Sequence, residues 1–188
     1  MLRVAFSAKA GSRKTEASKY VSEMLGVGNS INVKFADPLY DLMYLTQDYL
    51  GVPRHKDGKF LQLIGTEWGR DKDSLLWVNK FKSTVKDIGD SKIIICDDVR
   101  MMNELEAVKD LGFFTIRINR ADELRKEFLV GRNTSHKSEN DLDGKEELFD
   151  WVIENNTNDI KYFRNQVRLA IMTALSKKQV GIYAENHA

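Results

Sequence analysis

The chain has 188 residues, of which 42% are hydrophobic and 30% charged, as expected for one globular domain with a sizeable core. A formal net charge of +1 gives no broad basic field for DNA, RNA or an acidic membrane, so any anion site must be local. The single cysteine, Cys96, excludes an internal disulfide and a cysteine-rich zinc site, and no apolar run approaches the ~20 residues of a membrane helix. We therefore expect a single domain in a reducing compartment, the cytoplasm.

Strands and helices are predicted to alternate along the chain. The predicted strands are residues 2–7, 31–36, 92–96, 113–119 and 150–154. The predicted helices are residues 14–25, 37–49, most of 60–90 with an interruption near 65–71, 103–111, about 121–130 and 159–175. This alternation predicts an α/β domain with a parallel sheet covered on both faces. Ligands of such sheets bind beyond the carboxyl ends of the strands, so the polar stretches after each strand are the candidate sites.

The first of these stretches, SAKAGSRKT at residues 7–15, partly matches the phosphate-binding pattern G-x-x-x-x-G-K-[ST]. Lys14 and Thr15 match its end, whereas Ala8 and Arg13 replace its two glycines. The stretch follows a predicted strand and opens a predicted helix, which is the context that a phosphate loop needs. Lys14 could then reach a transferred phosphate and the Thr15 hydroxyl could ligate Mg²⁺. The alternative is a solvated basic turn.

Arg13 is the main departure from that pattern, and only Gly11 lies inside the loop. If position 13 requires a positive φ, a residue other than glycine costs about 1–2 kcal/mol there. The Arg13 side chain must then point away from bound phosphates or join them as an extra cation. Either outcome affects how well the loop holds a nucleotide.

The stretch DDVRMMNE, residues 97–104, follows the apolar strand KIIIC. A carboxylate there could hold Mg²⁺ through water, and Arg100 could form a two-pronged contact with a phosphate. Asp97 and Asp98 are adjacent in an extended chain, so at most one of them faces a given ligand. Alternatively, Asp98 caps a helix and Arg100 pairs with a surface acid.

Two further stretches carry candidate substrate contacts. Asp37 precedes Pro38 and could lie near an acceptor nucleotide, although aspartate before proline is also a common helix N-cap. Trp68 and Arg70 could supply a surface for base stacking and a phosphate clamp. Equally, Trp68 could belong to the core, where we place Trp77 and also the third tryptophan, residue 151.

Arg120 follows the fourth predicted strand, and Arg125 and Arg132 lead into the polar segment 131–147. A segment that brings arginine over a phosphoryl group would exclude water and stabilise charge in the transition state. The alternative is an ordinary surface loop. His136 lies far in sequence from the other two histidines, which argues against a histidine metal triad. No Cys–His or Ser–His pair points to a covalent intermediate.

Together these motifs resemble the phage-type deoxynucleoside monophosphate kinases, within the P-loop nucleoside monophosphate kinase superfamily. The resemblance covers residues 2 to about 175 and is most specific in its middle motifs. It rests on the strings FSAKAGSRKT, KFADPL, LQLIGTEWGRD followed by WVN, IIICDDVRMMNE and HKSENDLD, and on the segment around Arg120. The departure from the family is Ala8 and Arg13 in place of glycines.

The resemblance implies a three-layer P-loop kinase fold with a five-stranded parallel sheet and helices on both faces. It implies one domain over residues 1–188, with an NMP-binding helical region at about 37–90 and a lid at about 120–147. The implied activity is transfer of the ATP γ-phosphate to a deoxynucleoside monophosphate (dNMP), giving the diphosphate, with Mg²⁺. Its partners would be small-molecule nucleotides, with no membrane or nucleic acid and with a homodimer as an option. Its location would be the cytoplasm, of the host if the protein is viral.

The resemblance also implies roles for individual residues. ATP would contact Ala10, Gly11, Ser12, Arg13, Lys14, Thr15, Asn155 and Asn156. Thr15 and Asp98 would hold the metal. The acceptor would contact Asp37, Trp68, Arg70, Arg100 and His136, and a lid loop would contain Ser138. Catalysis would depend on Lys14, Arg120, Arg132 and Asp98.

Two alternatives stay open at this point. The first is a kinase of the same fold acting on a hydroxymethylated pyrimidine, free or in DNA, although the near-neutral charge argues against a polymer substrate. The second is a nucleotide-binding module that has lost catalysis, which Ala8 and Arg13 motivate. Base preference and the roles of residues 51–59 and 178–188 are left open.

Overall fold

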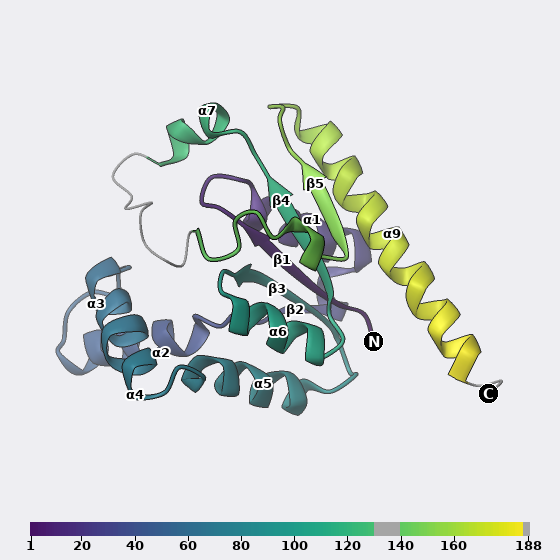
Figure 1. The fold of residues 1–188 in the computed structure, drawn as a ribbon. Coiled ribbons are helices and arrows are strands. Elements are labelled where there is room, and N and C mark those ends of the chain that lie inside the picture. Colours follow the sequence, from purple (N-terminus) through teal and green to yellow (C-terminus); the bar gives the residue numbers. More distant parts are fainter. Residues whose placement is uncertain (130–139, 186–188) are drawn as a thin grey trace.

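The computed structural model describes residues 1–129 and 140–185 (Figure 1). Its centre is a five-stranded sheet in the order β2-β3-β1-β4-β5, in which every paired strand is parallel. The strands are β1 (Arg3–Ala8), β2 (Ser30–Asn32), β3 (Ile93–Val99), β4 (Phe114–Asn119) and β5 (Trp151–Glu154). The predicted α/β architecture is confirmed.

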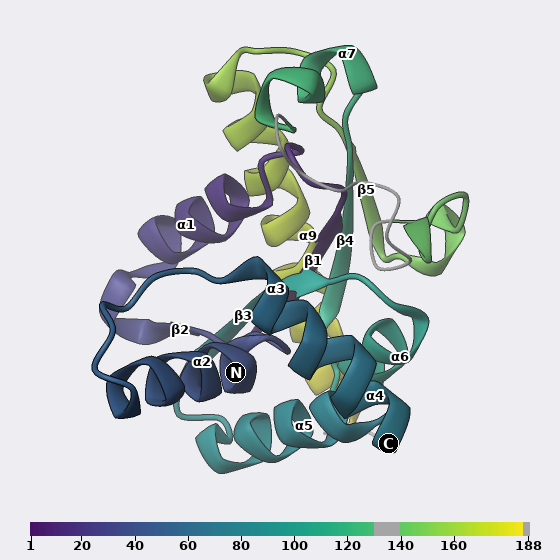
Figure 2. The same ribbon diagram turned by 90° about the vertical axis from the view of Figure 1, so that its left-hand side faces the viewer.

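Helices cover both faces of the sheet (Figures 1 and 2). The longer helices are α1 (Lys14–Leu25), α2 (Asp37–Tyr49), α5 (Leu76–Ile88), α6 (Met102–Asp110) and α9 (Ile160–Glu185). The short helical segments are η1 (Val27–Asn29), α3 (Gly58–Gln62), η2 (Leu63–Trp68), α4 (Gly69–Lys72), α7 (Asp122–Arg125), η3 (Lys126–Phe128) and η4 (Glu146–Leu148). Within the described residues, no helix is both long and apolar enough to cross a membrane.

Alternation along the strands builds two separate cores. Val4 and Phe6 of β1 pack with residues of α1 and α9, whereas Ala5 packs on the opposite face with residues of α5 and α6. The same split occurs in β3, where Ile95 joins the first core and Ile94 joins the second. These two cores give the three layers of the fold, and they explain why β3 reads as a continuous apolar run.

The structure differs from the sequence prediction at several points. β2 ends at Asn32 because the chain turns just beyond Val33, whose N–H still bonds to the Ile95 carbonyl. Helix α9 runs ten residues further than predicted, to Glu185 rather than to residue 175. The last part of the predicted lid is not an exposed loop, since Leu142 is 2% exposed and packs in the core beside α5 and α6.

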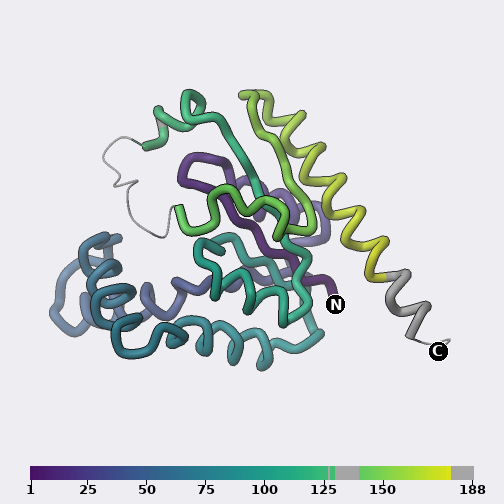
Figure 3. Tube along the Cα trace, viewed as in Figure 1, coloured from purple at the N-terminus to yellow at the C-terminus, as the bar shows by residue number. Residues whose placement is uncertain are grey.

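The helices α2 to α4 lie to one side of the sheet, on the same side as the β1–α1 connection and α7 (Figures 1 and 3). The interruption predicted near residues 65–71 is a π-helical turn followed by Gly69. A Cβ at Gly69 would lie 2.6 Å from both the Ile64 oxygen and a ring carbon of Trp77, so this close approach requires glycine. Trp77 is 4% exposed and donates to the Gly65 carbonyl at 2.8 Å, which confirms it as core.

Candidate active site

The loop between β1 and α1 turns sharply at two positions with positive φ. Gly11 has φ 80° and Arg13 has φ 70° and ψ 28°, so position 13 does adopt the left-handed conformation. The Ser12 N–H bonds to the Lys9 carbonyl at 3.3 Å and closes the turn. Helix α1 then begins at Lys14, so the positive end of its dipole faces the loop. Loop and helix terminus together form a cradle suited to an anion.

Lys14 and Thr15 sit at the mouth of this cradle. The Lys14 Nζ donates to the carbonyl oxygen of Ala8 at 2.6 Å, so the ammonium folds back across the loop to the end of β1. Thr15 is exposed, which leaves its hydroxyl accessible to a ligand. Both placements are compatible with the predicted roles, which stay predictions.

Asp97 faces the loop from the end of β3. Its side chain is 3% exposed, and one carboxylate oxygen accepts from the Ser18 hydroxyl at 2.9 Å. The other oxygen lies 3.1 Å from the Lys34 ammonium. Ser18 is one turn beyond Thr15 in α1, so the Asp97 carboxylate lies on the phosphate-loop side. Burial lowers the pKa of Lys34, but the Asp97 carboxylate outweighs it and leaves that pKa raised, which keeps the ammonium charged.

Asp98 points to a different element. Its carboxylate accepts from the backbone N–H groups of Phe35 at 3.1 Å and Ala36 at 3.0 Å, directly before α2. Burial, and next the charge of Glu104, raise the pKa of Asp98 to about 6. This carboxylate therefore anchors the start of α2, and its neighbour Asp97, to which the sequence analysis gave no separate role, is the carboxylate that faces α1 and the phosphate loop.

A register shift accompanies the two aspartates. Ala5 of β1 pairs with Cys96 of β3, but Ser7 pairs with Val99, so β3 has one residue more than β1 over this interval. Such irregularities commonly re-aim side chains beside functional sites. Here the shift falls on Asp97 and Asp98, the residues that separate toward α1 and α2.

The structure brings Arg70 and Arg100 to one buried carboxylate. Arg70, in α4, donates to Glu104 at 2.6 Å, and the second Glu104 oxygen accepts from the backbone N–H groups of Arg100 at 2.8 Å and Met101 at 3.2 Å. Glu104 is 2% exposed. It thus holds the guanidinium of Arg70 and the backbone of Arg100, but the sequence analysis gave it no role. A glutamate three residues after a helix N-cap is the signal that could have found it.

Asp37 and Trp68 flank this region. Asp37 lies in the first turn of α2, and its carboxylate accepts from the Lys34 N–H at 2.7 Å. Burial raises the pKa of Asp37 although that hydrogen bond lowers it. Its visible contact is therefore in the turn before α2. The N-cap of α2 is Ala36, so the alternative prediction of Asp37 as the N-cap is wrong. Trp68 is 53% exposed and so is not a core residue.

Arg120 is 6% exposed, and its guanidinium bonds to the β5–α9 loop. It donates to the carbonyls of Asn155 at 3.1 Å and Thr157 at 2.8 Å, and to the Asn158 side chain at 2.6 Å. The Asn156 side chain accepts from the Ala121 N–H at 2.9 Å. Arg120 therefore joins the end of β4 to the loop after β5, a structural role that its predicted catalytic role did not include.

Other predicted lid residues are placed differently. Arg132, His136 and Ser138 lie outside the described residues. Arg125, to which the sequence analysis assigned no contact, is 6% exposed and donates to the Ala10 carbonyl at 2.9 Å, while its other terminal nitrogen pairs with Asp122. It thereby packs the segment after β4 against the outside of the phosphate loop.

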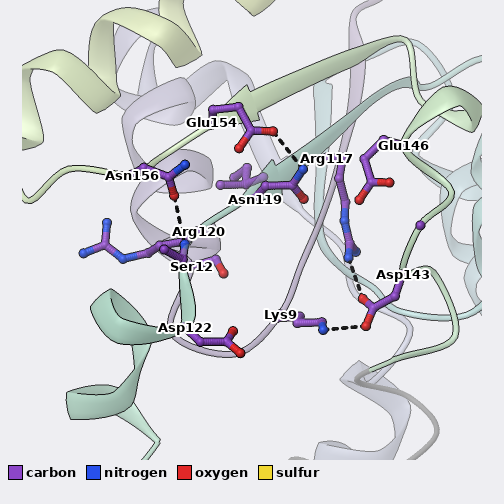
Figure 4. A pocket seen from close by; sticks show the side chains of 13 residues that line it. Lys9, Ser12, Arg117, Asn119, Arg120, Asp122, Asp143, Glu146, Glu154 and Asn156 are labelled. Carbon is purple, nitrogen blue, oxygen red and sulfur yellow. Dashed lines mark hydrogen bonds and ion pairs between the residues drawn. The ribbon is translucent and has the colours of Figure 1, made fainter.

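A cavity of about 420 Å³ lies beside the loop at the carboxyl ends of β4 and β5 (Figure 4). Lys9 and Arg117 both point at the Asp143 carboxylate, which pairs with Lys9 and lies 3.0 Å from Arg117. Arg117 is 5% exposed and also donates to Ser7 at 3.0 Å. On the opposite side the wall is formed by the segments 119–122 and 154–156.

A divalent ion here would depend on few protein ligands. In residues 1–129 and 140–185 there is no group of three or more His, Cys, Asp or Glu side chains arranged to hold a metal. A phosphate-loop Mg²⁺ needs fewer, because substrate phosphates and water complete its octahedral shell. The exposed Thr15 hydroxyl and the buried Asp97 carboxylate fit that requirement.

Comparison with known proteins supports the same fold. No protein-family model matches the sequence. A protein of Acanthamoeba polyphaga mimivirus, provisionally named a deoxynucleotide monophosphate kinase, is 27% identical over 184 residues, covering 84% of this chain and 89% of that relative. A gluconokinase from Sinorhizobium meliloti superposes with a TM-score of 0.55 at 10% identity, covering 99% of this chain and 98% of its own. A shikimate kinase from Acinetobacter baumannii, in complex with shikimate, superposes with a TM-score of 0.54 at 12% identity, and the match covers 95% of both chains.

Proposed function

We propose that this protein, which belongs to the P-loop nucleoside monophosphate kinase superfamily, transfers the γ-phosphate of ATP to a deoxynucleoside 5′-monophosphate. The observation that carries the proposal is a shared sheet edge. Lys14 follows β1, Asp97 lies near the end of the neighbouring strand β3, and Arg70 pairs with Glu104 in α6, the helix that follows β3. The 27% identical viral relative supports the choice of acceptor.

The donor would lie along the phosphate loop. The first-turn N–H groups of α1 face its phosphates, and Lys14 would exchange its contact with the Ala8 carbonyl for a phosphate oxygen. Thr15 and Asp97 would hold Mg²⁺, which would neutralise charge on the transferred group. The cavity beside segments 119–122 and 154–156 would take the nucleoside part of ATP.

The acceptor would lie on the other side of that edge. A guanidinium suits a phosphate because it can donate two parallel hydrogen bonds, and Arg70 is held in place by the buried Glu104. Trp68, exposed in the neighbouring turn, would stack on the acceptor base. The attacking atom is an oxygen of an ionised phosphate, so the reaction needs alignment and positive charge and no general base.

The segment from 120 to 147 would close over the two nucleotides as a lid. Its described part is anchored at both ends, by Arg125 on the phosphate loop and by Asp141, which accepts from the Met102 N–H at 2.9 Å. Contacts of Arg132 and His136 with the substrates stay predictions. Closure would exclude water, which competes with the acceptor for the γ-phosphate.

The direct test is product formation from the four common dNMPs and from modified pyrimidine nucleotides, with Mg-ATP. We expect a diphosphate from at least one of them, and loss of that product in Lys14→Ala. Lys19→Ala is the matched control, because Lys19 is an exposed lysine of the same helix, 4.0 Å from Glu23. If no nucleotide is phosphorylated, the proposal is wrong.

The left-handed Arg13 gives a specific reason to keep one alternative, a nucleotide-binding protein with impaired turnover. Calorimetry with ATP and with each dNMP would identify it as binding without a product. Modified duplex DNA with labelled ATP would identify the other alternative, a kinase that acts on a base in DNA.

A further inference from the structure

Arg13 is unusual in the part of the chain that the structure describes. It is the one residue other than glycine there with a positive φ, 70°. Gly11, two positions earlier, has a similar φ of 80° and carries the residue that suits this conformation. Glycine at position 13 would remove the strain. We therefore looked for a favourable interaction of the arginine side chain that offsets it.

The contacts of the Arg13 side chain do not account for that cost. One terminal nitrogen donates to the Asn158 carbonyl at 3.3 Å, which is long for a charge-assisted hydrogen bond. The other, Nη1, is buried and has no hydrogen-bond partner among the described residues. A buried guanidinium N–H without an acceptor is itself unfavourable. Arg13 thus combines backbone strain with a buried donor that has no partner among the described residues.

Two more unpaired polar atoms lie at the same seam between the phosphate loop and the β5–α9 loop. The Ser12 hydroxyl and the Asn155 side-chain oxygen are buried without partners among the residues described, and each residue is 1% exposed. The Asn155 amide reaches the Ser12 carbonyl at only 3.5 Å, which fixes these atoms next to one another. The guanidinium of Arg120 also reaches this loop, at Asn158. Unpaired buried groups that gather in this way indicate a missing ligand or ordered water.

We propose that Arg13 is a binding residue for the donor nucleotide, whose guanidinium donates to an oxygen of the triphosphate. The inference rests on the proposed function for its ligand, but concerns the donor alone and not the acceptor. Arg13 adjoins Lys14 at the opening of α1, where the donor phosphates would lie. A flexible side chain there can turn its unpaired Nη1 toward a phosphate and keep or release Asn158. The arginine thus supplies directly a contact that a glycine loop makes only with its backbone.

Calorimetric titration of the full chain with Mg-ATP tests this inference. Two variants separate charge from strain. Arg13→Gln keeps a polar but shorter side chain and the same backbone strain while it removes the charge, whereas Arg13→Gly removes both strain and side chain. We expect each variant to bind ATP at least about tenfold more weakly than the wild type, which corresponds to about 1.4 kcal/mol. Arg13→Gly should nevertheless unfold at a higher temperature.

Inorganic tripolyphosphate identifies the part of the nucleotide that is bound. If the guanidinium contacts phosphate, Arg13→Gln weakens the binding of tripolyphosphate and the binding of ATP by a similar factor. Arg168→Ala is the control for a lost positive charge, because Arg168 is exposed on α9 and bonds to Asn165. It should bind both probes as the wild type does.

Three results would overturn the inference. They are ATP binding by Arg13→Gly that equals or exceeds that of the wild type, weakened ATP binding with unchanged tripolyphosphate binding, and equal losses in Arg168→Ala. The first is also the result expected if ordered water fills the seam. A wild type that binds ATP but phosphorylates no dNMP would remove the proposed function and leave this inference standing. A wild type that binds no ATP would remove both.

Discussion

Arg70 and Glu104 join the helical region before β3 to helix α6 after it. They lie 34 positions apart in sequence, and their charged groups meet at 2.6 Å with the carboxylate 3% exposed. A buried carboxylate with three donors, two of them backbone N–H groups after β3, fixes where the guanidinium can point. The pair therefore sets the position of a cation on the acceptor side of the sheet edge.

Replacing Arg70 should weaken binding of the acceptor and leave binding of the donor unchanged. We expect Arg70→Ala to raise the KM for the dNMP about tenfold or more, because a bidentate phosphate contact is lost. The KM for ATP should not change. The matched control is Arg54→Ala, since Arg54 pairs with Asp48 on the surface and lies outside the site. Equal effects on both substrates would contradict the assignment.

The two adjacent aspartates should separate catalysis from folding. Asp97→Asn should lower kcat by about 10²-fold and raise the Mg²⁺ concentration needed for half activity, because Asp97 faces Ser18 and the phosphate loop. Asp98→Ala should instead reduce stability, since two backbone N–H groups before α2 lose their acceptor. Steady-state kinetics over a Mg²⁺ series and thermal unfolding give both readouts. A larger loss of kcat in Asp98→Ala than in Asp97→Asn would support the metal-side role that the sequence predicts for Asp98.

Asp98 should also give the protein a distinctive pH dependence. Its pKa is about 6 in the folded chain, against about 4 when unfolded, so between these values the folded state binds more protons. Its contribution to stability is therefore fully present below pH 4 and is lost as the pH rises through 6, by at most about 3 kcal/mol. Denaturant unfolding from pH 4 to 7 should show this loss in the wild type and not in Asp98→Asn. If stability changes with pH in the same way in the wild type and in Asp98→Asn, the pKa of Asp98 is not raised.

Alanine substitutions of Trp68 and Trp77 should have different effects, the first on acceptor binding and the second on stability. Trp68, 53% exposed, should tolerate alanine with little change in the unfolding temperature, while the KM for the dNMP rises. Trp77, 4% exposed, should lose about 3–5 kcal/mol of stability on the same change. Trp68→Phe should recover most of the acceptor affinity, because it keeps a flat ring. Unchanged kinetics in Trp68→Ala would remove the stacking role.

Much of the fold follows from local sequence patterns. Alternating strands and helices predicted the parallel sheet, and the continuous apolar run of β3 predicted a strand buried on both faces. The departures from the glycine pattern also anticipated the condition now seen at Arg13, a positive φ. These features depend on residues close together in the chain, which sequence periodicity and turn chemistry report directly.

The remaining features depend on contacts between distant residues. Whether Asp97 or Asp98 faces the loop is decided by strand register and by Ser18, which is 79 positions from Asp97. Arg120 meets acceptors 35 or more positions away, so its sequence context, a cation after a strand, could not show that backbone carbonyls surround it. Arg125 reaches a carbonyl 115 positions away and was missed for the same reason.

The central claim is that donor and acceptor phosphates meet across one sheet edge, between Lys14 and Arg70. The most direct measurement is calorimetry with a bisubstrate analogue, in which adenosine and a deoxynucleoside are joined by five phosphates. We expect it to bind at least about 100-fold more tightly than the dNMP alone, because one molecule fills both sites. Lys14→Ala and Arg70→Ala should each remove most of that gain. The account would be contradicted if the analogue bound no more tightly than ATP, or if either substitution left its affinity unchanged.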